Sequence, residues 1–183
     1  MNRIEAIKQH YLDNWRSDPE SSLFDKGPVR ELPAGFRVLL FPPRAGREMW
    51  TYATCGMSSP SDESQMELHI FSPKQSESIV EILHALAHFH HNKIQCNLWH
   101  TVNFGRPWLE SSICSFGLIS LPYLDGPALE NFEYEDSTIK FYWLIPVTKS
   151  EVDFKRTAGI EALEEKFEDA NLAYWDPSRS SLV

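Results

Sequence analysis

The stretch from Thr138 to Phe167 most strongly limits what this chain can fold into. Its first part is rich in β-branched and aromatic residues, which predicts a strand that ends at Pro146, because proline cannot donate to a sheet ladder. The nearly continuous apolar run from Ile139 to Ile145 predicts a central strand that is buried on both faces. Thr148 and Glu151 then have the form of a capping box, so a helix should begin directly after the strand and pack on the sheet.

Apolar residues at a period of two predict the remaining strands. The run at 65–71 alternates strictly, with Met66, Leu68 and Ile70 on one face, and it is therefore expected to be half-buried. Strands are also expected at 35–41, 48–55 and 112–121, with the first two joined as a hairpin. Residues 97–107 are expected to form a loop or a short strand.

Apolar residues at helical spacing predict helices over about 2–16 and 78–91. The second is expected to begin with a capping box of Ser78 and Glu81. The tail beyond Trp175 is too polar to form a core element. These elements predict an α+β fold, in which residues 1–183 form a single domain with a mixed, twisted β-sheet flanked by helices.

Composition limits the classes of partner. The formal net charge of −9 argues against nucleic acid, whose phosphates require clusters of Lys and Arg. No stretch approaches the roughly 20 apolar residues of a membrane span. The first residues are polar and lack the apolar core of a signal peptide, and three cysteines without C-x-x-C spacing predict reduced thiols. A cytoplasmic location is therefore expected, and the oligomeric state is left open.

Three histidines form the feature of this chain that most resembles an enzyme site. His84, His88 and His91 share one face of the predicted helix, and such a stripe could bind a divalent metal ion in a small hydrolase. The residues between His84 and His88 are Ala, Leu and Ala, so the general base of an H-E-x-x-H motif is absent. A solvated or interface face is the favoured interpretation, and no cofactor or metal is predicted. His90, on the apolar face, is expected to bond a backbone carbonyl in the core.

Other catalytic patterns are weaker still. Cys96 and Cys114 could act as nucleophiles with His100, but no orienting carboxylate lies near Cys96 in the sequence, and Cys114 lies in an apolar strand. The sequence contains neither a G-x-S-x-G elbow nor a glycine-rich phosphate loop. No catalytic residue is therefore expected.

Trp99, Phe104 and Trp108 concentrate aromatic side chains in one predicted loop. Two interpretations stay open. The cluster could cover the core, as large apolar residues commonly do. Alternatively, it could anchor a partner, because Trp and Tyr are enriched in binding hot spots.

Several motifs, in order, resemble the Suppressor of fused domain family. The run IKFYWLIPVTKSEVDFKRTAGIEALEEKF at 139–167 is similar to the closing strand and helix pair of that domain. LHALAHF at 83–89 matches its mid-domain helix, and NLWHTVNFGRPW at 97–108 matches a short histidine-containing run that follows. DPSRS at 176–180 resembles its polar, arginine-containing end. The resemblance covers about residues 50–179, with the helix at about 2–16 outside it.

The resemblance implies a single-domain bacterial member that binds a protein and does not catalyse a reaction. Animal members sequester a transcription factor by clamping an extended segment of it. Bacterial members are associated with polymorphic toxin systems, as immunity proteins that neutralise a cognate toxin. The acidic balance of this chain suits a basic toxin, since opposite fields speed encounter.

The expected partner-binding residues lie at the end of the mid-domain helix and in the loop that follows. In animal members an acidic residue commonly precedes the histidine of this loop, whereas Trp99 stands there in this chain. An extended segment of the partner is expected to dock on this surface. The predicted contacts are Phe89, Trp99, His100, Phe104 and Trp108.

Overall fold

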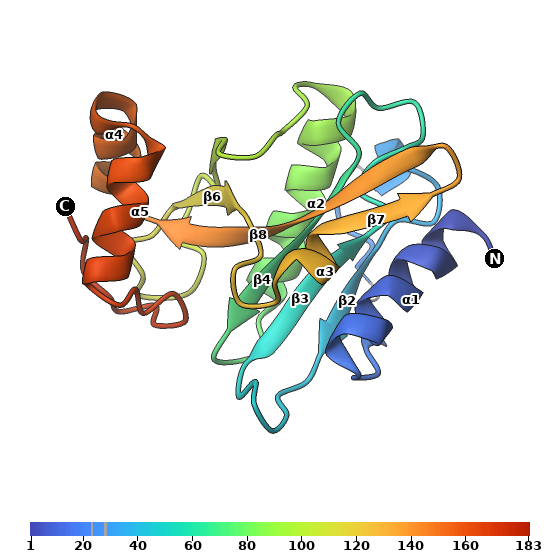
Figure 1. The fold of residues 1–183 in the computed structure, drawn as a ribbon, viewed down its shortest axis with the longest axis horizontal. Coiled ribbons are helices and arrows are strands. Elements are labelled where there is room, and N and C mark those ends of the chain that lie inside the picture. Colours follow the sequence, from blue (N-terminus) through green and yellow to red (C-terminus); the bar gives the residue numbers. More distant parts are fainter. Residues whose placement is uncertain (23, 28) are drawn as a thin grey trace.

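A long strand, β8 (Ser137–Val147), crosses the centre of the molecule and organises its sheet (Figure 1). The computed structural model describes residues 1–22, 24–27 and 29–183. Within that part of the chain the sheet has eight strands, in the order β1-β2-β3-β4-β8-β6-β5, with β7 also paired to β8. The other strands are β1 (Glu20–Ser21), β2 (Arg37–Phe41), β3 (Trp50–Cys55), β4 (Met66–Ser72), β5 (Thr101–Asn103), β6 (Phe116–Ser120) and β7 (Asn131–Tyr134).

The sheet is mixed, because β8 runs parallel to β4 and antiparallel to β6 and β7. Helices cover both of its faces, so the predicted α+β single-domain fold is confirmed. The helices are α1 (Arg3–Trp15), the 3₁₀ turn η1 (Val29–Glu31), α2 (Glu77–Asn92), α3 (Pro127–Glu130), α4 (Lys149–Ala158) and α5 (Ile160–Asp169). None of the helices in the described ranges is both long and apolar enough to cross a membrane.

Alternate residues of β8 enter three separate hydrophobic cores, since successive side chains of a strand point to opposite faces. One face packs with α2, and the opposite face packs with α1 at one end and with α4 and α5 at the other (Figure 1). The predicted central strand, buried on both faces, is confirmed. The residues are Tyr142 and Leu144 on the α2 side, Ile139 and Phe141 on the α1 side, and Trp143 and Ile145 on the α4–α5 side.

Pro146 does not end the strand, which continues to Val147. Pro146 lies opposite Gly117 in the ladder with β6, but the pairing of β8 with β4 has already ended at Trp143. The carbonyl of Pro146 accepts a hydrogen bond from the guanidinium of Arg179 at 2.9 Å, on the side away from β6. The position of the missing N–H therefore faces no strand, and Pro146 removes no hydrogen bond between strands.

The expectation that β4 is half-buried is wrong, because every residue from Met66 to Ser72 is buried. The carboxylate of Glu67 accepts hydrogen bonds from the Thr54 hydroxyl at 2.6 Å and from the backbone N–H of Gly56 at 2.9 Å. A polar side chain can be buried when donors satisfy it in this way. The polar residues that alternate with apolar ones along β4 therefore face a second buried layer and not solvent.

The start of α4 follows the predicted capping box, whereas the start of α2 does not. Thr148 caps α4, and the Glu151 carboxylate returns to the Thr148 backbone N–H at 2.8 Å. Helix α2 begins at Glu77, one residue before the predicted cap, and its N-cap residue, Ser76, makes no side-chain cap bond. Glu81 is instead paired with Arg106.

The C-terminal tail is fixed to α4 by a buried ion pair. Arg179 donates to both carboxylate oxygens of Glu151, at 2.7 and 2.8 Å, and Glu151 is completely buried. The backbone N–H of Leu182 also donates to Glu151. This pairing lowers the pKa of Glu151 despite the cost of burial. The polar tail therefore does form part of the core, because its charge meets a complementary buried group.

Other segments differ from the predictions through tertiary pairing. The strand predicted at 112–121 is limited to Phe116–Ser120. β5 lies within the stretch predicted as a loop or short strand. No pattern in the sequence predicted β1, α3 or β7, which are short and owe their form to neighbouring strands.

Candidate partner-binding groove

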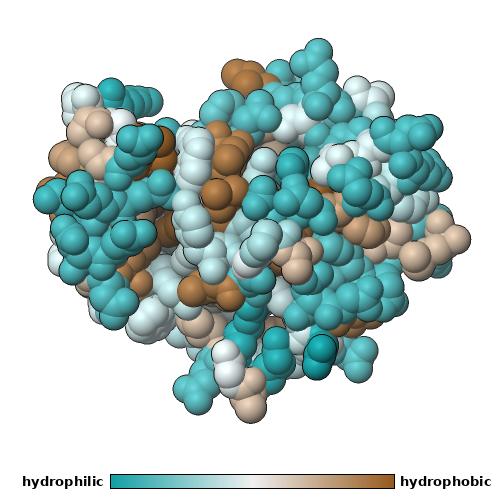
Figure 2. All heavy atoms as spheres, in the orientation of Figure 1, coloured by the Kyte–Doolittle hydropathy of each residue, from teal (hydrophilic) through white to brown (hydrophobic). Residues whose placement is uncertain are grey.

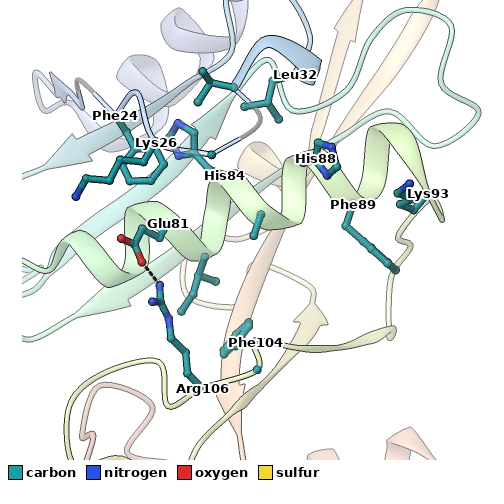
Figure 3. Close-up of a pocket in the computed structure, with 15 residues that line it drawn as sticks. Phe24, Lys26, Leu32, Glu81, His84, His88, Phe89, Lys93, Phe104 and Arg106 are labelled. Atoms are coloured by element: carbon teal, nitrogen blue, oxygen red, sulfur yellow. Dashed lines mark hydrogen bonds and ion pairs between the residues drawn. The ribbon is translucent and has the colours of Figure 1, made fainter.

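An apolar groove runs along the exposed side of α2 (Figure 3). Ile82, Ala85 and Phe89 lie at successive turns of the helix and form its floor, because residues three or four positions apart share a helical face. Phe24 lines one side and Phe104 lines the other. The hollow has a volume of about 630 Å³, and a second hollow of about 340 Å³ adjoins it between α2 and β5.

Charged residues of both signs surround this groove. Arg106 is paired with Glu81, as the dashed line in Figure 3 shows. Lys26 contacts Glu77 at 2.6 Å, although both side chains are well exposed, so the pair adds little to stability. The groove therefore combines an apolar floor with a polar rim, which is the usual anatomy of a protein interface.

The three histidines of the predicted stripe, which lies on α2, contact three different partners. His84 is buried, donates to the Val80 carbonyl at 2.8 Å and lies 4.4 Å from the ring of Phe24. His88 contacts Glu31 at 2.6 Å. His84 is thus not solvated as one of the two expected alternatives would have it, because Phe24 and Phe36 pack against its ring.

His91 faces Asp62 at 3.4 Å, away from the contacts made by the other two histidines. Among the described residues, no group of three or more His, Cys, Asp or Glu side chains is arranged to hold a metal ion. The hydrolase alternative depended on convergence of His84, His88 and His91, and their side chains diverge. In this structure the three side chains of the stripe are therefore not gathered into one set of ligands.

His90 occupies the core position that the sequence predicts. Its Nε2 donates to the carbonyl of Ser64 at 3.0 Å, and its Nδ1 accepts from the backbone N–H of Cys96 at 2.9 Å. Burial lowers the pKa of His90, so the ring is neutral in the folded protein near pH 7. The imidazole thus joins α2 to the segment that leads into β5.

The predicted binding residues separate into three environments. Phe89, with 39% of its surface exposed, and Phe104 both line the groove. His100 is exposed, and Trp99 is half-buried with a backbone φ of 67°. Trp108 is completely buried, and its indole N–H donates to the Ser112 hydroxyl at 3.0 Å. The prediction of Trp108 as a surface contact is therefore wrong, and the residue covers the core.

Strand β5 forms an open edge of the sheet beside the groove. Among the described residues it pairs only with β6. The backbone N–H of Phe104 donates toward the β6 side, to Ser115 at 2.9 Å. Because the pattern alternates along an antiparallel strand, the backbone groups of Thr101 and Asn103 point away from the sheet. An unpaired edge of this kind is a template for an added strand.

The model of the family described as Suppressor of fused protein (SUFU) matches residues 33–180. The chain belongs to the SUFU family. The crystal structure of a SUFU homologue from Neisseria gonorrhoeae FA 1090 is 34% identical, with a TM-score of 0.86 over 99% of this chain and 97% of that chain. A search of curated proteins found no match.

Two more distant SUFU structures share the fold alone, at 12% identity. One is the Sufu–Fu complex, with a TM-score of 0.69 over 98% of this chain and 90% of that chain. The other is Drosophila Suppressor of Fused, with a TM-score of 0.68 over 98% of this chain and 50% of that chain. This SUFU chain thus corresponds to half of the Drosophila chain. The matched length includes α1, which the resemblance in sequence had left outside.

Sequence reasoning missed one entire wall of the groove in this SUFU domain. Phe24 and Leu32 come from the stretch between α1 and β2, which has the polar composition of a connection. The scattered apolar residues of that stretch were the available signal, but they follow no helical or strand period. Ala85 was overlooked because it is small, although its size is what leaves the floor hollow.

Proposed function

We propose that this SUFU-family chain is a non-enzymatic protein-interaction domain that binds an extended segment of a partner protein in the α2–β5 groove. The observation that carries the proposal is the continuity of an apolar hollow with an unpaired strand edge. Main-chain bonds along β5 supply affinity for an extended segment, and side-chain pockets supply specificity. Phe89 and Phe104 provide the aromatic contacts on which such sites depend.

We further propose that the partner is a cognate toxin and that the chain acts as its immunity protein. The support is the resemblance to bacterial members of the family, together with the net charge of −9, which favours association with a basic protein. The Sufu–Fu complex, which has the same fold, is itself an assembly of two proteins. The candidate is the product of a toxin gene adjacent to the gene for this chain.

Calorimetry with that purified toxin tests the proposal. Phe89→Ala is expected to weaken binding by about 2 kcal/mol, or about 30-fold, because it removes an aromatic anchor from the centre of the groove. Ile113→Ala is the matched control, since Ile113 is an exposed apolar residue that does not line the groove. Circular dichroism spectra of both variants should match the wild type.

Three results would overturn parts of this proposal. Unchanged affinity for both Phe89→Ala and His100→Ala would place the partner on another surface. Absence of binding to the adjacent toxin, with a folded protein, would remove the immunity role. Hydrolytic activity of the purified protein that is lost on chelation of metal ions would contradict the non-enzymatic proposal.

A further inference from the structure

A separate cleft lies on the face of the sheet opposite α2, between α5 and strands β6 and β8. It has a volume of about 240 Å³, which is below the roughly 300–1,000 Å³ of pockets that hold drug-sized ligands. In Figure 2, brown hydrophobic atoms show between the teal outer surface of the α4–α5 pair, at the left, and the rest of the molecule. A space of this size fits one long side chain better than a cofactor.

Aromatic side chains form the wall of this cleft. Trp143 and Tyr174 meet edge to face, with their ring centroids 4.8 Å apart, and Phe167 lies on α5 beside them. Tyr123 and Leu124 stand at the mouth, with 58% and 51% of their surfaces exposed. Aromatic faces attract cations, and they attract the flat guanidinium group most often.

The rim of the cleft is acidic. Glu164 and Glu168 lie one turn apart on α5 and both line it, and the Tyr123 hydroxyl donates to Glu164 at 2.8 Å. None of the described residues that line the cleft is a lysine or arginine. Arg47 lies behind the wall, over the ring of Phe71, but its charge is balanced by Asp125. The cleft thus presents negative charge around an aromatic surface.

One polar atom in the wall lacks a partner. Trp143 has only 5% of its surface exposed, and its Nε1 makes no hydrogen bond to any described residue. A buried donor without a partner destabilises the structure, so an acceptor that reaches it is favoured. A peptide carbonyl is such an acceptor, whereas a free amine or polyamine offers none.

We propose that this cleft receives an arginine side chain from an extended segment of a partner protein. The guanidinium lies against the aromatic wall and pairs with Glu164 and Glu168, and a carbonyl of the same segment accepts from Trp143 Nε1. Arginine satisfies these groups better than lysine, because its planar fork both stacks on rings and bonds two carboxylates. The site is separate from the α2–β5 groove and does not depend on the function proposed for it.

The test uses the blocked peptide acetyl-Gly-Arg-Gly-amide and two-dimensional NMR of the full chain. The peptide is expected to shift the indole Nε1–H signal of Trp143, which the Trp143→Phe variant identifies. The peptide in which citrulline replaces arginine keeps the shape without the charge, and it should produce no saturable shift. Spermidine tests the free-amine source and should leave the indole signal in place.

Two pairs of Glu→Gln variants on α5 distinguish binding in the cleft from a general effect of net charge. Glu164→Gln with Glu168→Gln should weaken binding of the arginine peptide at least tenfold, because both charge-assisted hydrogen bonds to the guanidinium lose their carboxylate. Glu161→Gln with Glu165→Gln changes the net charge equally on α5 but does not touch the cleft, and it should leave affinity unchanged. Phe89→Ala should also have no effect.

Three outcomes would overturn the inference. Equal binding of the arginine and citrulline peptides would show that charge plays no part. Equal losses in the two glutamine pairs would assign the effect to net charge rather than to the cleft. An indole shift with spermidine equal to that with the arginine peptide would make this a site for free amines.

Discussion

At the scale of single residues, His69 on β4 is the most unusual buried group. Its ring is 1% exposed and lies 5.4 Å from the rings of both Trp15 and Phe71. Its Nε2 stands 3.5 Å from Asp125, which is itself paired with Arg47. Burial lowers the pKa of His69 from 6.5 to about 4, and Asp125 offsets only part of that effect.

The pKa of His69 predicts a loss of stability in acid. Between pH 6.5 and about 4 the unfolded chain binds a proton at this position that the folded protein excludes. The free energy of unfolding therefore falls as the pH falls through this window, and His69 accounts for about 3 kcal/mol of the change. Urea unfolding of the wild type and of His69→Phe at several pH values measures this contribution.

The contribution of His69 is obtained from the difference in unfolding free energy between the wild type and His69→Phe at each pH. The comparison is needed because Glu67 changes stability with pH in the opposite direction. Burial raises the pKa of Glu67 to about 7, so this group makes the folded protein less stable as the pH rises from 4.5 to 7. That contribution is present in both proteins and cancels in the comparison. Identical pH dependence of the wild type and His69→Phe would contradict the prediction.

At the scale of elements, β5 determines whether a partner can extend the sheet. Its residue Asn103 points its backbone N–H outward, where no described strand pairs with it. Its side chain accepts a bond from the Gly105 N–H at 2.8 Å. Three residues of exposed edge are short enough to avoid aggregation and still offer hydrogen bonds to a segment.

Asn103→Pro is expected to weaken binding of an extended partner by about tenfold, since it removes an outward N–H without breaking a bond to β6. Proline is tolerated there because Val102 before it already has extended backbone. Asn103→Ala is the control, because it loses the same side-chain bond to Gly105 but keeps the N–H. Equal affinities of the two variants for the toxin, measured by calorimetry, would exclude pairing through this edge.

The elements also show what could be read from the sequence. Strand β8 and the cap of α4 were predictable, because their signals are local: a run of apolar residues and a Thr–Glu spacing. The burial of Glu67 and His69 was not, since it depends on Trp15 of α1 and on donors from β3 and the residue that follows it. Of the candidate site, Phe89 and Phe104 were predicted, whereas Trp108 and the Phe24 wall depended on how distant segments pack.

At the scale of the whole molecule, the sheet separates two surfaces of different character. The α2 face has an apolar groove whose rim carries both signs of charge. The α5 face has an aromatic cleft with an acidic rim. A partner that used both would have to wrap around the sheet edge, so the two sites are expected to act independently. Variants at Phe89 and at Glu164 should then have additive effects on any ligand that binds both.

The position of β8 also governs the order in which a ribosome can build this protein. All three cores require β8, yet this strand emerges only after residue 137 has been made. Nascent chains that end at Asp136 leave the edges of β4 and β6 open, and they are expected to be digested rapidly in pulse proteolysis. Chains that end at Val183 should resist, and protection of the shorter chain would contradict this order. Strands β4, β6 and β7 therefore lack their shared neighbour until the late-translated β8 has been made.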